Sequence, residues 1–141
     1  MDTGEVRRRL QQARRQARER AAGRRDRTAA AGEAWNTFAR RVAGPLVRQL
    51  GDALRAENVT ITLATPPDAV RLGLGHGGDF VEVALDTSGE APLVIGRSSR
   101  SHGAETLTDE RPVRAGAGPE AITEEELLDF LLDALGPWLE R

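Results

Sequence analysis

Two histidines are the residues whose type could most readily support catalysis or metal binding. His76 and His102 lie in segments predicted as loops, and each has a carboxylate nearby in the sequence. Histidine can act as a base near neutral pH or ligate a metal. Two histidines 26 residues apart, in a chain without cysteine, give no metal-ligand spacing. Solvated loop histidines are therefore the favoured interpretation.

Two further segments resemble anion-binding loops. Residues 73–78 are rich in glycine, but a phosphate-binding loop needs a helix N-terminus after it. The alternation after residue 79 predicts a strand instead, which favours a hairpin turn that needs positive φ. The segment Arg97–Ser101 reads Arg-Ser-Ser-Arg-Ser and could bind an anion, but no base or oxyanion donor for a serine nucleophile is evident. We expect a wide, solvated loop there.

Four acids near the C-terminus could form paired carboxylates for metal or acid–base chemistry. Glu125 and Asp129 are four residues apart and so share a helix face. Thr123 with Glu126 three residues later, before an apolar run, predicts a capping box. Acids in a first helical turn, Glu124 included, are also favoured by the helix dipole. Helix capping thus accounts for the glutamates, and we expect no catalytic residue, no metal site and no cofactor.

The strongest functional signal is a basic N-terminal segment, residues 1–31, called the arginine arm below. It holds ten arginines and four acids, a balance of +6, whereas residues 32–141 hold ten arginines and eighteen acids, a balance of −8. Four arginines share one face of a predicted helix, at spacings of seven, four and seven residues, and two more flank them. These six are the expected partner-binding or phosphate-binding residues: Arg7, Arg8, Arg14, Arg15, Arg18 and Arg25.

An acidic body with a basic arm indicates electrostatic docking. We expect a small, non-enzymatic, bacterial-type interaction or adaptor protein whose arm docks onto an acidic protein partner, or which self-associates. The alternative is a nucleic-acid-associated protein that binds phosphate backbone non-specifically through residues 5–27, because no aromatic residue is interleaved with the arginines. A solvated tail is the third interpretation. The chain has no lysine, which a GC-rich genome would also produce, so the arginine bias alone does not indicate phosphate recognition.

Composition excludes several classes of protein. The 141 residues suffice for one α+β domain, residues 32–141, preceded by the arm at residues 1–31. No apolar run reaches the roughly 18 residues of a membrane span, and no apolar segment follows the basic N-terminus as in a secretory signal. The lack of cysteine excludes disulfides, zinc ribbons and thiol nucleophiles. We expect a cytoplasmic protein without membrane contact.

Helical periodicity appears at both ends of the chain. Residues 5–31 are predicted helical, with Gly23 and the Thr28–Gly32 segment expected to weaken or end the helix. Residues 33–56 predict a better helix, with a kink or a fresh start at Gly44-Pro45. The apolar run after Thr123 predicts a C-terminal helix that stops at Gly136-Pro137. The expected core residues on these helices are Trp35, Phe38, Leu46, Leu50, Leu128, Leu131 and Leu135.

Between the helices the hydrophobic period changes to two. This predicts strands over residues 58–65, 69–75, 80–86 and 92–98, and a weaker edge strand near Glu105–Thr108 that ends near Pro112. Short turns between them predict an antiparallel meander of four or five strands with one face buried. The expected fold is α+β: an N-terminal helix (long or kinked at Gly44-Pro45), the meander, and a C-terminal helix packed on the same sheet face.

Overall fold

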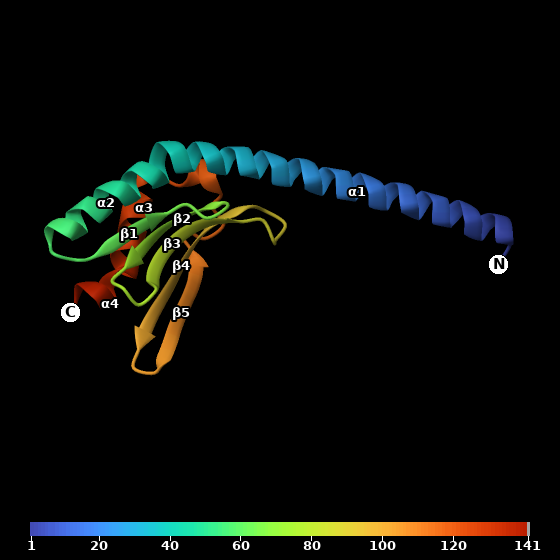
Figure 1. Ribbon diagram of the computed structural model, residues 1–141. Helices are drawn as coiled ribbons and strands as arrows, with labels where there is room; N and C mark the ends of the chain where they lie inside the picture. Colours follow the sequence, from blue (N-terminus) through green and yellow to red (C-terminus); the bar gives the residue numbers. More distant parts are fainter. Residues whose placement is uncertain (141) are drawn as a thin grey trace. The chain divides into compact units, whose positions relative to one another are not determined.

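A computed structural model describes residues 1–140 and has the predicted α+β order (Figure 1). The helices are α1 (Thr3–Phe38), α2 (Gly44–Ala56), α3 (Glu124–Ala134) and the single turn α4 (Gly136–Leu139). Five strands, hydrogen-bonded in sequence order and all antiparallel, form one sheet: β1 (Ile61–Ala64), β2 (Ala69–Leu74), β3 (Asp79–Asp86), β4 (Leu93–His102) and β5 (Glu105–Pro112). The chain divides into two compact units, residues 1–30 and the rest.

The N-terminal helix is long, as predicted. α1 is one uninterrupted helix of 36 residues, so of the two outcomes expected at Gly23 and Thr28–Gly32, a weakened or an ended helix, the helix does not end. A single glycine costs a helix only about 1 kcal/mol relative to alanine, and the alanines that follow Thr28 are the best helix formers. The last part of α1 is also held by packing, because Ala31, Trp35 and Phe38 are buried.

The sequence predicts a kink or a fresh start of the helix at Gly44-Pro45, and a new helix does start there. A π-helical turn, Ala39–Ala43, follows α1, and α2 begins at Gly44 with Pro45 in its first turn. Proline fits there because the first N–H groups of a helix have no intrahelical acceptor. A Cβ atom at Gly44 would lie 2.7 Å from the carbonyl oxygen of Ala39, which explains why glycine occupies this position.

The core lies between one sheet face and the helices, as predicted. Residue pairing puts Val70 opposite Val83, and Leu72 opposite Val81, on this helix-covered face. They form one buried cluster with side chains from every long helix, among them Trp35, Phe38, Leu46, Leu127, Leu131 and Leu135. Leu50 and Leu128, also expected in the core, are partly buried against the cluster. Seven predicted core residues thus all contact it.

Glycines let the helices approach the sheet closely. A Cβ atom at Gly51 of α2 would lie 2.9 Å from Cδ1 of Ile61 on β1. A Cβ atom at Gly96 of β4 would lie 2.0 Å from Cζ of Phe130 on α3. The helices α2 and α3 therefore cover different strands on the same face of the sheet: α2 lies over β1 and β2, and α3 lies over β4.

The opposite face of the sheet, called the second face below, is less exposed than predicted. Glu82 and Ala84 of β3 and Ile95 of β4 point away from the helix-covered core, yet each is almost fully buried. Ala69, Ala84 and Ile95 form a small apolar cluster of their own, with Leu93 packed against it. β3 lies in the middle of five strands, so side chains from both neighbouring strands shield its residues.

The C-terminal helix begins as predicted. Thr123 is the N-cap of α3, and its hydroxyl accepts from the main-chain N–H of Glu126, while the Glu126 side chain accepts from the N–H of Thr123. This reciprocal pair is the expected capping box. α3 ends at Ala134, just before Gly136-Pro137, as predicted. In residues 1–140, no helix combines the length and apolarity that a membrane crossing requires.

Candidate interaction surfaces

The arginine arm presents its charges to solvent. All six predicted binding arginines lie on α1 and are exposed: Arg7, Arg8, Arg14, Arg15, Arg18 and Arg25. At about 100° per residue, Arg7, Arg14, Arg18 and Arg25 fall within about 40° of one another around the helix. The helix therefore arranges these four as one stripe, with Arg8 and Arg15 outside it.

Most arm arginines have no ionic partner among residues 1–140. Of the ten, Arg9 alone forms an ion pair, with Glu5 one turn earlier, at 2.9 Å between Nη2 and Oε1. The body differs, because five of its arginines are paired with carboxylates there: Arg55, Arg71, Arg97, Arg111 and Arg114. Unpaired positive charge is thus concentrated on the arm.

An apolar row runs beside the arginine stripe. Val6 is 49% exposed and Leu10 is 59% exposed. Leu10 precedes Arg14 by four residues, so the two side chains are neighbours on the same helix surface. Ala13 and Ala17 continue the row at helical spacing. A helix with an apolar row next to a cationic row has the pattern of a segment that docks into a partner.

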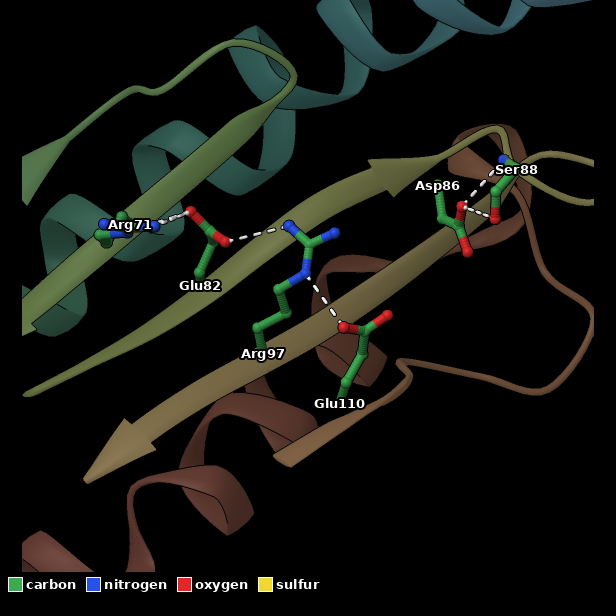
Figure 2. Close-up of polar contacts among 6 residues, drawn as sticks. All are labelled: Arg71, Glu82, Asp86, Ser88, Arg97 and Glu110. Atoms are coloured by element: carbon green, nitrogen blue, oxygen red, sulfur yellow. Dashed lines mark hydrogen bonds and ion pairs between the residues drawn. The ribbon is translucent and has the colours of Figure 1, made fainter. Parts of the chain in front are cut away.

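The second face of the sheet carries a row of alternating charges that sequence reasoning missed. Strand pairing places Arg71 opposite Glu82, Glu82 opposite Arg97, and Arg97 opposite Glu110. Figure 2 shows these four side chains in a line across β2, β3, β4 and β5. We call this line the charge ladder. Opposite charges directly across strands stabilise a sheet pair by a few tenths of a kcal/mol, up to about 1 kcal/mol.

Glu82 is the centre of the charge ladder. Its side chain is 3% exposed, and its two oxygens accept from different arginines: Oε1 from Arg71 Nε at 3.0 Å, and Oε2 from Arg97 Nη1 at 3.3 Å. The Arg71 guanidinium also lies 3.9 Å above the centre of the Phe80 ring, a cation–π contact. A buried carboxylate is therefore neutralised on both sides.

Arg97 connects the buried and exposed halves of the charge ladder. It bonds Glu82 through Nη1 and Glu110 through Nε, each at 3.3 Å. Burial, the largest single influence, lowers the pKa of Arg97, but the bonds to Glu82 and Glu110 outweigh it and leave the pKa raised. The guanidinium is thus committed to two internal carboxylates, and the ladder is a structural feature of the sheet.

The turn after β3 is organised by one aspartate. Asp86 Oδ1 accepts from the hydroxyl of Ser88 at 2.6 Å and from its main-chain N–H at 2.9 Å (Figure 2). The hydroxyl bond and then the main-chain bond lower the pKa of Asp86. This is a local side-chain turn, which starts the connection to β4.

A buried aspartate links the C-terminal turn to the sheet. Asp79 is 8% exposed and accepts from Trp138 Nε1 through Oδ2 at 3.0 Å. Its Oδ1 accepts from the main-chain N–H of Ser101 at 2.9 Å and from the Ser101 hydroxyl at 3.0 Å. The bond between Trp138 and Asp79 holds Trp138 against the sheet just past the end of α3. Asp79 and Ser101 were not predicted to meet.

The serine and arginine residues of Arg97–Ser101 lie in β4, so the predicted wide loop is wrong. Antiparallel pairing with β5 extends the strand through this polar segment. Alternation puts Arg97 and Ser99 on one sheet face, and Ser98 and Arg100 on the other. The cluster therefore does not converge on one anion, and Arg97 is already occupied by carboxylates.

The two histidines lie toward the same end of the sheet, His76 before β3 and His102 at the end of the antiparallel strand β4. His76 lies in the predicted turn between β2 and β3, where Gly75 and Gly78 have positive φ, as the hairpin interpretation requires. His102 ends β4 and pairs with Glu105, so its predicted loop position is wrong. His76 lines a hollow of about 400 Å³ with Arg71 and Phe80, among other residues. Among residues 1–140, no three His, Cys, Asp or Glu side chains are grouped to hold a metal ion.

The C-terminal acids divide into two groups. Glu126 is used in the capping box and also pairs with Arg114 at 3.3 Å. The hydrogen bond from the Thr123 N–H is the main cause that lowers the pKa of Glu126. Glu125 and Asp129 lie on the exposed side of α3, and no ion pair involves them in residues 1–140. Asp133, further along α3, bonds Arg111 of β5.

Comparison with known proteins gave no match: no family model, no curated protein and no solved structure is similar to this chain.

Proposed function

We propose that this protein is a non-enzymatic adaptor whose arginine arm docks onto an acidic surface of a protein partner. The observation that carries the proposal is the contrast in ion pairing. Nine of the ten arm arginines lack a carboxylate partner among residues 1–140, whereas the described body pairs five of its arginines internally. Exposed charges without an internal partner raise the rate of association with oppositely charged proteins and favour those proteins over others.

A protein partner is favoured over a polyanion by the apolar row. Val6 and Leu10 are about half exposed and adjoin the arginine stripe. Phosphate backbone offers nothing for these side chains to bury against, whereas an amphipathic helix in a protein groove buries its apolar row and pairs its charges. Burying a leucine of this kind contributes on the order of 1 kcal/mol.

Binding to nucleic acid is the second candidate. It is supported by the stripe of Arg7, Arg14, Arg18 and Arg25, which is exposed and continuous along the helix. Contacts to phosphate would be independent of sequence and would weaken steeply with salt. The net charge of −8 on residues 32–141 restricts such binding to the arm.

The test is affinity isolation of the tagged full-length chain from its native cells at low salt, with and without nuclease. The variant Arg7→Gln/Arg14→Gln/Arg18→Gln/Arg25→Gln keeps helix-forming side chains and removes the stripe's charge. We expect an acidic protein that is enriched by the natural chain, resists nuclease and is lost with the variant. An identical set of proteins from both chains would contradict the proposal, and a cargo removed by nuclease would support the second candidate.

A further inference from the structure

We propose that the arginine arm docks antiparallel onto the exposed face of α3 in a second copy of this chain. The inference rests on the proposed function and names its partner. Its starting point is the outer face of α3, where Glu125 and Asp129 form a row of unpaired acids within the described residues. Leu128 and Leu132 form a parallel row, in which Leu132 is 44% exposed and Leu128 is partly buried against the core cluster. This face therefore combines charge with uncovered apolar surface.

The arm carries the complementary pattern at the same spacing. Arg14 and Arg18 are four residues apart, as are Glu125 and Asp129, so both pairs span about 6 Å along their helices. Leu10 adjoins Arg14 on the arm, just as Leu132 lies beside Asp129 on α3. Pairing the two helices buries leucine against leucine and brings both arginines to carboxylates.

The handedness of the two patterns sets the direction of docking. On α3 the charged row lies about 60° further around the helix than the apolar row, and on the arm about 90° further, in the same rotational sense. When two such helices pack through their apolar rows, their charged rows lie on the same side of the contact only if the helices run antiparallel. This places Arg14 opposite Asp129, Arg18 opposite Glu125, and Leu10 near Leu132.

A second copy fits this surface because the contact is reciprocal. Each chain holds both an arm with a balance of +6 and a body with a balance of −8, so two copies form the same contact twice. A two-fold dimer has this form, in which residue i contacts residue j and j contacts i. The second contact forms within an existing complex and adds to avidity without any new surface.

Charge-swap variants of the full-length chain test the pairing. Arg14→Glu/Arg18→Glu places acids against acids, and Glu125→Arg/Asp129→Arg places arginines against arginines. We expect sedimentation equilibrium at low salt to show self-association weakened about ten-fold or more in each variant alone. An equimolar mixture should recover the natural association, because each variant then meets its complement. Circular dichroism confirms that both variants remain folded.

Introduced cysteines test the direction, because the natural chain has none. A Leu10→Cys copy mixed with a Leu132→Cys copy should form a disulfide-linked heterodimer. The matched control is Leu107→Cys on β5, whose side chain is similarly exposed, at 39% against 44%. Equal yields for the two mixtures, or charge-swap variants that associate like the natural chain, would overturn the inference.

The two proposals fail in different ways. A natural chain that stays monomeric at every concentration overturns the second-copy inference. The proposed function then still stands if the isolated chain retains an acidic, nuclease-resistant protein that the four-glutamine variant loses. If self-association persists but ignores both arm substitutions, the second-copy inference is wrong, and the affinity isolation alone then decides the proposed function.

Discussion

Glu82 is the most deeply buried charged residue among residues 1–140. Its carboxylate is buried between two arginines that are each about 40% exposed. Removing it leaves both guanidinium groups without this partner and creates a cavity on the second face. Because both guanidinium groups stay accessible to water, removal of Glu82 lowers the free energy of unfolding less than the loss of one partner in a fully buried ion pair would.

We therefore predict that Glu82→Ala lowers the free energy of unfolding by about 1–3 kcal/mol, measured by urea denaturation. Glu110→Gln is the matched control, because that side chain is 57% exposed and bonds the same Arg97. Its effect should stay within about 0.5 kcal/mol. Equal losses for the two substitutions would show that burial of Glu82 does not matter.

The charge ladder also shows which contacts between single residues can be predicted from the sequence. The pair of Arg71 and Glu82 could have been predicted, since the tight turn at residues 75–78 brings the two opposite each other. Arg97 lies in the segment that was predicted as a loop, so its pairing with Glu82 and Glu110 could not be predicted. No such local signal exists for Asp79 and Trp138, which are 59 residues apart and meet only through the folded core. The arm arginines were selected as candidate binding residues from the charge balance, which needs no tertiary information, and their binding role stays a prediction.

At the scale of elements, hydrophobic period and turn residues predicted the meander and all the long helices. The errors occurred where tertiary pairing overrides composition. β4 continues through the polar residues Ser98–Ser101 because β5 supplies its hydrogen-bond partners. α1 continues past Gly32 because Trp35 and Phe38 are packed in the core, with ring centres 5.7 Å apart. A pattern in one segment cannot report on a partner strand or on distant packing.

The capping box of α3 gives a prediction about pH. The folded pKa of Glu126 lies below its ordinary value of 4.5, mainly because the Thr123 N–H donates to its carboxylate. Stability from this bond is therefore fully present above pH 4.5 and is lost as the pH falls through the lower folded value. Glu126→Gln keeps an acceptor but does not titrate in this range.

We predict that the difference in unfolding free energy between the natural chain and Glu126→Gln is constant above the ordinary pKa and falls in more acidic solution. Urea denaturation across acidic and neutral pH measures it, and other carboxylates cancel because both chains share them. Thr123→Ala should cost about 1 kcal/mol at neutral pH. A difference that grows on acidification would contradict the assigned bond.

For the whole molecule, charge separation along the chain is the property on which the proposed function depends. A balance of +6 on residues 1–31 and −8 on residues 32–141 gives every copy both a basic segment and an acidic body. Exposed ionic contacts are screened over about 10 Å at 0.1 M salt and about 3 Å at 1 M. Docking through the arm should therefore be strong at low ionic strength and weak at high ionic strength, unlike association through a buried apolar interface.

The most direct measurement is the molar mass of the full-length chain by size-exclusion chromatography with light scattering, at low and high salt. The same measurement on the variant Arg7→Gln/Arg14→Gln/Arg18→Gln/Arg25→Gln isolates the role of the stripe. We predict a mass above that of one chain for the natural protein at low salt, which falls to the monomer mass at 1 M salt and in the variant. One unchanged mass in all four measurements would contradict the account of the arm as a helix that docks electrostatically onto a second copy of this chain.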